Sequence, residues 1–127
     1  MESNKPDKKS PILRLWYALI YSLSGMAQAW RDEQAFRQEV VLSIVLIPCA
    51  FLLPIDLSIR LILILSMIIV LIVELINSSV EAVTDLVTKD LHDLAKKAKD
   101  CTSAAVLISL VFSGAMWALA LYGWLLN

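Results

Sequence analysis

The chain alternates between long apolar runs and short charged segments, and this pattern predicts its main elements. Three runs contain no charged side chain, and they cover residues 40–55, 61–73 and 101–126. A helix needs about 20 apolar residues to cross a hydrocarbon core of about 30 Å. We therefore predict an all-α membrane protein, in which residues 1–127 form a single integral-membrane domain. Its transmembrane helices are expected at about residues 36–55, 58–86 and 98–126.

The region before the first of these runs has two distinct faces. Large apolar side chains recur every three or four positions, at Ile12, Leu13, Trp16, Leu19, Ile20, Leu23, Met26 and Trp30. Arg14 and Tyr21 are seven positions apart and share the opposite face. This periodicity predicts an amphipathic helix at the membrane surface over residues 12–30. The polar residues 1–11 are expected to form a flexible cytoplasmic tail.

A secretory signal peptide is the alternative interpretation of this region. Lys8 and Lys9 precede an apolar stretch that ends in the small residues of an Ala27-Gln28-Ala29 sequence. However, Arg14 adjoins the short apolar core, and aromatic residues dilute that core. A signal sequence also has no need of two-faced periodicity, so the surface helix is the preferred interpretation.

Composition and charge support a membrane location and indicate an orientation. Hydrophobic residues make up 59% of the chain and the mean hydropathy is +0.74, which excludes an ordinary soluble domain. The sequence has no basic patch with interleaved aromatic residues, so nucleic acid is not an expected partner. All 11 Lys and Arg residues except Arg60 lie in the amino-terminal region or between the second and third spans. The positive-inside rule then predicts a cytoplasmic amino terminus and an external carboxyl terminus.

Polar residues near the end of the second span form a stripe on one helix face. The stripe occupies a sector of about 100° and consists of Glu74, Asn77, Ser78, Glu81 and Asp85. Carboxylates at membrane depth are costly, so the stripe is a candidate functional site. Two other interpretations remain. The stripe could be a polar seam that joins helices in a membrane scaffold, or the cation or proton site of a small oligomeric transporter that uses Glu74 and Glu81.

The charged residues around the stripe include the groups needed for phosphoryl transfer from a nucleotide. That chemistry requires carboxylates for a divalent ion, positive charge for phosphates and a group that orients the attacking hydroxyl. Glu33 and Glu81 could hold the ion, and Glu74 could accept the proton of an alcohol. Lys99 and Arg14 could contact phosphates. Because the chain contains only 3 Gly residues, a P-loop and a kinase glycine-rich loop are excluded.

Four stretches of the sequence resemble a known family, namely residues 33–39 (EQAFRQE), 74–85 (ELINSSVEAVTD), 92–100 (HDLAKKAKD) and 103–106 (SAAV). They are similar to the small integral-membrane diacylglycerol kinases of bacteria, and the resemblance extends from about Arg14 to the carboxyl terminus. It implies a homotrimer of three-span subunits in the inner membrane, each with an amino-terminal surface helix. It also implies direct transfer of a phosphoryl group from ATP to diacylglycerol, a membrane lipid, with Mg²⁺ as cofactor.

The resemblance also assigns roles by position. Glu74 would be the catalytic proton acceptor, and Glu33 and Glu81 would be the metal ligands. The ATP contacts would be Arg14, Tyr21, Glu33, Glu81, Asp90, Leu91, His92, Lys99 and Asp100. The lipid contacts would be Arg14, Glu74, Ser103 and Trp117. Two further residues, Asn77 and Asp85, would line the site.

Substrate choice and subunit arrangement stay open at this point. Related members of the family phosphorylate undecaprenol, although the run at residues 33–39 favours the diacylglycerol branch. The surface helix has Leu23, Ser24 and Ala27 where tryptophan and basic residues are expected. Three spans do not easily enclose both a nucleotide and a lipid, so the sites are expected at subunit interfaces. Glu33 could serve the site of its own subunit or that of a neighbour.

Overall fold

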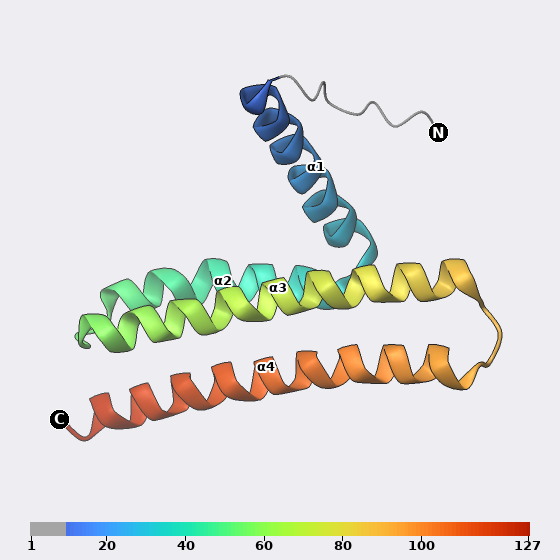
Figure 1. Ribbon diagram of the computed structural model, residues 1–127. Helices are drawn as coiled ribbons and strands as arrows, with labels where there is room; N and C mark the ends of the chain where they lie inside the picture. The colour runs from blue at the N-terminus through green and yellow to red at the C-terminus, as the bar shows by residue number, and fades with distance from the viewer. Residues whose placement is uncertain (1–9) are drawn as a thin grey trace.

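The computed structural model describes residues 10–127, which form four α-helices (Figure 1). They are α1 (Pro11–Asp32), α2 (Gln34–Leu52), α3 (Leu57–Val87) and α4 (Asp93–Leu125). Helix α1 begins where the sequence provides a start signal, because Ser10 caps it and Pro11 occupies its first turn. Residues 1–9, most of the expected tail, lie outside the described residues.

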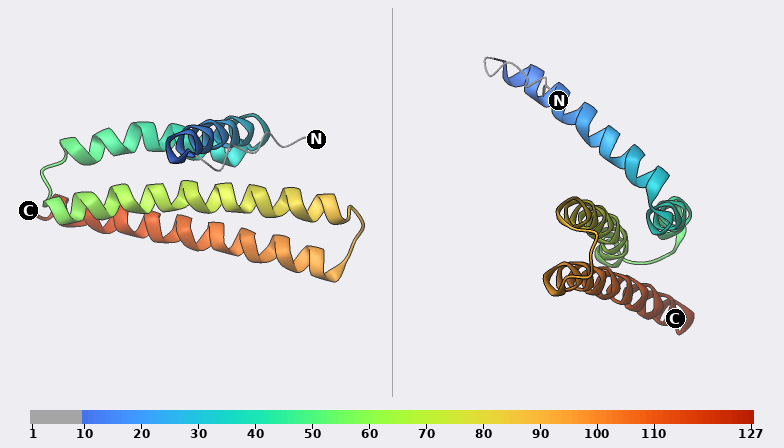
Figure 2. Two further views of the ribbon diagram at one scale, coloured as in Figure 1. Left: turned by 45° about the horizontal axis from the view of Figure 1, so that its top comes forward. Right: turned by 90° about the vertical axis from the view of Figure 1, so that its right-hand side faces the viewer.

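Helix α3 runs antiparallel to both α2 and α4 and contacts both of them (Figures 1 and 2). Within residues 10–127, these three helices are the ones long and apolar enough to cross a membrane. The prediction of an all-α chain with three candidate spans is therefore confirmed. Helix α1 meets the others only near its carboxyl end, and its amino-terminal part extends away from them (Figure 2, right).

Two helix ends differ from the predicted positions for local reasons. Helix α2 ends at Leu52, because Pro54 disfavours a helical backbone at Leu53, and Arg60 reaches back from α3 to donate to backbone oxygens at this end. Its Nε lies 2.8 Å from the Ala50 oxygen, and its Nη2 lies 3.0 Å from the Leu53 oxygen. Helix α4 begins at Asp93, because the His92 Nδ1 accepts a hydrogen bond from the Leu94 N–H at 3.1 Å. The charged first turns of α4 are thus helical as well.

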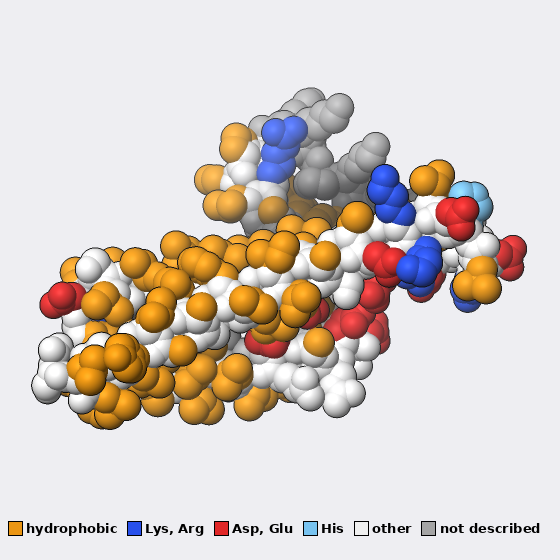
Figure 3. All heavy atoms as spheres, turned by 90° about the horizontal axis from the view of Figure 1, so that it is seen from below, with side chains coloured by type: hydrophobic (Ala, Val, Ile, Leu, Met, Phe, Trp, Pro, Cys, Tyr) orange, Lys and Arg blue, Asp and Glu red, His pale blue; other side chains and the backbone are white. Residues whose placement is uncertain are grey.

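The interior of the chain is small, and most of its apolar surface faces outward. The buried apolar residues are Ala29, Phe36, Ala50, Leu63, Met67 and Val70. Figure 3 shows apolar side chains over much of one face of the molecule, away from its charged end. Such a surface would favour aggregation in water, but in a bilayer it is the face that lipid and neighbouring helices contact.

A buried pair of serines joins α3 to α4 inside this apolar region. The Ser66 and Ser113 hydroxyls are 3.0 Å apart, and Ser66 also donates to the Leu63 oxygen at 2.7 Å. Small hydroxyl residues allow helices to approach closely and to form a hydrogen bond between them. This contact helps to fix α4 alongside the face of α3 that carries the polar stripe.

Candidate functional site

Four carboxylates gather where the junction of α1 and α2 meets α3. Glu33 comes from the junction, Glu39 from α2, and Glu74 and Glu81 from α3. Glu74 is only 5% exposed, and the other three lie close enough to interact with it electrostatically. Figure 3 shows acidic side chains gathered where the apolar surface gives way to the charged end of the molecule. The structure therefore brings the predicted base together with both predicted metal ligands.

The polar stripe of α3 orients two of these carboxylates. The Ser78 hydroxyl donates a hydrogen bond of 3.1 Å to Oε1 of Glu33. The Asn77 amide donates a longer bond of 3.5 Å to Oε1 of Glu81. The Asn77 Oδ1 is buried and has no hydrogen-bond partner within the described part of the chain. An acceptor oxygen without a partner therefore lies on the same amide that donates to Glu81.

The oxygen atoms of this cluster suit Mg²⁺, which needs only a few protein ligands, better than they suit a metal that is bound entirely by protein side chains. Within residues 10–127, no group of three or more His, Cys, Asp or Glu side chains could hold a metal ion. Mg²⁺, however, commonly binds one or two carboxylates and completes its coordination with waters and substrate phosphates. Glu33, Glu81 and the free amide oxygen of Asn77 provide such a partial set of oxygen ligands.

The first turns of α4 place cations near the outer end of the stripe. The Lys99 Nζ lies 2.6 Å from Oδ1 of Asp85, and it also interacts electrostatically with Glu81. Lys96 and Asp100 form an exposed ion pair one helical turn apart. Lys99 is thus placed beside the outer end of the stripe, whereas the Asp100 carboxylate is paired along its own helix.

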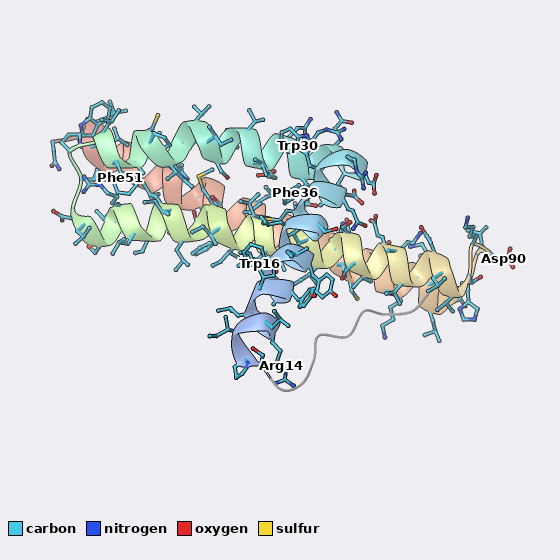
Figure 4. The ribbon with its side chains drawn as sticks, turned by 90° about the horizontal axis from the view of Figure 1, so that it is seen from above. Arg14, Trp16, Trp30, Phe36, Phe51 and Asp90 are labelled. Carbon is cyan, nitrogen blue, oxygen red and sulfur yellow. The ribbon has the colours of Figure 1, made fainter. Side chains whose placement is uncertain are left out.

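The loop between α3 and α4 contains three predicted ATP contacts, which lie far from the carboxylate cluster. The backbone N–H of Asp90 donates to the Thr88 hydroxyl at 3.1 Å, and His92 caps α4. Leu91 is fully exposed. Figure 4 shows Asp90 at the tip of the molecule, beyond the last turn of α3. In this chain, His92 therefore has a structural role as a helix cap.

The predicted contact Arg14, on α1, is not brought to the cluster within one chain. Figure 4 shows Arg14 at the end of α1 that points away from the other helices. Tyr21 is exposed and stacks with Tyr17, with ring centroids 6.3 Å apart. A groove of about 540 Å³ does separate α1 from α3, and Gly25, Ala29 and Ser78 contribute to its lining. A nucleotide or lipid headgroup that contacts both helices could enter there.

The two predicted lipid contacts on α4 differ in their surroundings. Ser103 is exposed on the outer surface. Trp117 lies deeper, in a cavity of about 170 Å³ that Glu39 also lines. Its buried Nε1 has no hydrogen-bond partner among the described residues. Sequence reasoning did not assign Glu39 to the site, although Glu39 directly precedes an apolar run as Glu74 directly follows one.

Comparison with known proteins places this arrangement in a family. Residues 20–121 match the sequence model of the family described as Prokaryotic diacylglycerol kinase. A diacylglycerol kinase of Pseudomonas aeruginosa is 46% identical over 110 residues, covering 87% of this chain and 89% of the relative. One of Helicobacter pylori is 45% identical over 120 residues (92% and 94%), and one of Escherichia coli is 40% identical over 109 residues (86% and 89%). The chain belongs to the prokaryotic diacylglycerol kinase family.

Proposed function

We propose that this protein is an ATP-dependent diacylglycerol kinase that produces phosphatidate at the cytoplasmic surface of the bacterial inner membrane. The observation that carries this proposal is the buried Glu74, which directly follows the uncharged run of residues 61–73 and precedes the charged end of α3. A lipid alcohol could approach Glu74 from the membrane side, while a nucleotide approaches from the side of Lys99. The names of the relatives support diacylglycerol as the acceptor.

The proposed mechanism is direct in-line transfer without a phosphorylated enzyme. Glu74 accepts the proton of the lipid hydroxyl as that oxygen attacks the γ-phosphorus of ATP, the bond from the γ-phosphorus to the β–γ bridging oxygen breaks, and ADP leaves. Glu33 and Glu81, together with the Asn77 amide oxygen, would hold Mg²⁺, which would neutralise phosphate charge when bound. Lys99 adds a further positive charge on the opposite helix. Burial of Glu74 keeps water away from the reacting atoms, which favours the lipid alcohol over hydrolysis.

We further propose that three chains assemble and that the sites form between them. A single chain leaves Arg14 and the exposed face of α4 away from the carboxylates. A neighbouring subunit could bring such groups to the cluster and cover the apolar helix faces. Glu33 bonds to Ser78 of its own chain, which supports a metal site formed within one subunit.

The orientation is proposed from the distribution of charge along these helices. The α2–α3 turn contains Arg60, whose side chain is engaged with backbone oxygens of that turn. The other end of the bundle contains Lys89, Lys96, Lys97 and Lys99. The positive-inside rule therefore supports a cytoplasmic carboxylate cluster and an external carboxyl terminus.

A transfer assay with purified protein in detergent micelles tests the proposed function. Labelled ATP and Mg²⁺ are supplied with either diacylglycerol or undecaprenol, and label is followed into the lipid fraction. We expect transfer mainly to diacylglycerol. Transfer mainly to undecaprenol would change the substrate and keep the chemistry. No transfer to either lipid by folded protein would contradict a lipid kinase, and ion flux without ATP consumption would instead indicate a transporter.

A further inference from the structure

The junction between α1 and α2 is held by a side chain that has no assigned role. The Nη1 of Arg37 donates to the backbone oxygens of Trp30 and Arg31, at 2.7 Å and 2.9 Å. These oxygens belong to the last turn of α1, whereas Arg37 is in the first turn of α2. Arg37 therefore spans the junction and ties the end of one helix to the beginning of the next.

Glu33 is the residue at which the two helices meet, and its backbone is extended (φ −115°, ψ 107°). Its N–H donates to the Ala29 oxygen at 2.9 Å, and its own oxygen accepts from the Arg37 N–H at 3.2 Å. It has neither the helical backbone of α1 nor that of α2. The angle of the junction consequently decides where the Glu33 carboxylate points. In this structure the carboxylate points to Ser78.

The last carbonyl groups of a helix lack intrahelical partners, and an arginine can supply them with several N–H donors from one rigid group. Loss of such a cap loosens the last turn of the helix. At this junction, loosening α1 would change the direction in which Glu33 leaves the backbone. Trp30 and Phe36 lie near this junction in Figure 4, and Phe36 is only 5% exposed, so the α2 side of the junction is already fixed by packing.

We propose that Arg37 is a positioning residue for the metal site, because it fixes the junction that aims the Glu33 carboxylate at the α3 stripe. This inference rests on the proposed role of Glu33 as a ligand of nucleotide-bound Mg²⁺. Residues behind a metal ligand commonly change metal affinity by about 10- to 100-fold when they are replaced. Arg37 would act in this way through the backbone, without touching the metal.

Arg60 provides a matched control at the other end of α2. It also uses its guanidinium to donate to backbone oxygens of a helix end, those of Ala50, Leu53 and Ile55. The carboxylates named above lie at the opposite end of α2. Replacement of Arg60 removes a similar cap and one positive charge, but it leaves the Glu33 junction intact.

The experiment compares the wild type with the Arg37→Gln, Arg60→Gln and Glu33→Gln variants of the full-length protein in micelles. Mn²⁺ replaces Mg²⁺, and its binding is measured by electron paramagnetic resonance at a saturating concentration of a nonhydrolysable ATP analogue. We expect Arg37→Gln to weaken Mn²⁺ binding by about 10-fold or more, in the same direction as Glu33→Gln. Arg60→Gln should bind Mn²⁺ as the wild type does.

The sign of the effect separates positioning from simple electrostatics. Removal of a positive charge near a cation site should strengthen Mn²⁺ binding, so weaker binding in Arg37→Gln requires a change in geometry. Amide hydrogen exchange gives a second measurement, and it should accelerate at residues 29–34 in Arg37→Gln and at residues 50–57 in Arg60→Gln.

Three results would overturn this inference. Unchanged or tighter Mn²⁺ binding in folded Arg37→Gln would show that the junction does not position a ligand. An equal loss in Arg60→Gln would show a general effect of destabilisation. Unchanged binding in Glu33→Gln would remove Glu33 as a ligand and the inference with it. None of these results affects the transfer assay with wild-type protein, so the kinase proposal would stand or fall separately.

Discussion

Glu74 is buried in an apolar region next to three other carboxylates, which is a costly arrangement for a side chain with only a structural role. Its position is explained if the carboxylate reacts with a group that arrives through the membrane. The neighbouring Glu33 and Glu81 have hydrogen-bond partners on α3 that set their orientation. At the scale of single residues, the proposed mechanism assigns Glu74 to proton transfer and Glu33 and Glu81 to a metal ion.

Replacement of Glu74 by Gln tests this division. The amide has nearly the same shape but cannot accept the hydroxyl proton, so we expect the rate of lipid phosphorylation to fall by about 100-fold or more. Affinity for a nonhydrolysable ATP analogue should change little, because Glu33, Glu81 and Lys99 remain. The measurements are kcat for transfer and equilibrium binding of the analogue.

The control for this experiment is Asp56→Asn, which removes a carboxylate from the α2–α3 turn at the other end of the bundle. It should retain normal turnover. Near-normal turnover in Glu74→Gln would remove Glu74 as the base, whereas loss of analogue binding would place it among the nucleotide contacts.

Lys99 and Lys97 form a second matched pair on α4. Lys99 is held by Asp85 beside the outer end of the stripe, whereas Lys97 is exposed and two residues away. Since a hydrogen bond to a charged group contributes about 1.5 to 3 kcal/mol, we expect Lys99→Gln to raise the KM for ATP by about 10-fold or more. Lys97→Gln should leave the KM near its normal value. Equal effects of the two substitutions on steady-state kinetics would contradict a specific phosphate contact.

Periodicity was sufficient to find the stripe on α3, because residues on one face of a helix keep their spacing in the sequence. It could not find Arg37, whose role depends on a helix break at Glu33 that no Gly or Pro marks. It also could not predict that Trp117 shares a cavity with Glu39, because that contact depends on how α2 and α4 pack. The roles of the site residues in catalysis stay predictions until they are measured.

At the scale of helices, the contact between α3 and α4 contains two links. One stabilises the pairing of the helices, and the other places Lys99 beside the stripe. The Ser66–Ser113 hydrogen bond lies inside the apolar part of this contact. The Lys99–Asp85 ion pair lies at its charged end. Because the two links are at different depths, the first can be removed without direct change to the site.

We expect Ser66→Ala and Ser113→Ala to lower stability by similar amounts, with a coupling energy of about 0.6 to 1.7 kcal/mol between them. Unfolding in mixed micelles with increasing sodium dodecyl sulfate, measured for both single variants and the double variant, gives this coupling. Turnover of the folded variants should stay near normal.

Ser109→Ala is the control for this pair. Ser109 is a buried serine on α4 whose hydroxyl donates to the Val106 oxygen of its own helix, at 2.7 Å. It should therefore show little coupling to Ser66. Additive effects of Ser66→Ala and Ser113→Ala would show that their hydrogen bond contributes nothing to the pairing of the helices.

The helix pattern could be predicted because each element has strong local signals, including long apolar runs and the two-faced periodicity of the first helix. Two boundaries differ from the predicted ones, and at each a side chain caps the helix end. Helix α2 stops at Leu52 where Arg60 caps it from the next helix, and α4 starts at Asp93 behind the His92 cap. The groove between α1 and α3 could not be predicted from the sequence either.

At the scale of the whole molecule, the proposed assembly can be tested by mixing subunits. The test asks whether the ligands of one metal site come from one chain or from two. Glu33 and Glu81 lie close to the same Glu74 within one chain. We therefore expect that mixing Glu33→Gln subunits with Glu81→Gln subunits restores no activity, because every metal site still lacks one ligand.

The measurement is transfer activity after the two variants are mixed in denaturant and refolded together into micelles. Wild-type protein treated in the same way is the control for reassembly. Recovery of activity in the mixture would mean that Glu33 of one subunit serves the metal site of another.

The unequal lengths of the helices have a consequence for the lipid environment. At 1.5 Å per residue, the 19 residues of α2 span about 28 Å, close to the hydrocarbon thickness, whereas the 31 residues of α3 span about 46 Å. Because α2 has little length to spare, its ends should lie at the two edges of the hydrocarbon core. The Glu33 junction is at one of these ends. A thicker or thinner bilayer would shift the headgroup plane relative to Glu74. The acyl-chain length of the host membrane would thus change how closely the lipid hydroxyl approaches Glu74.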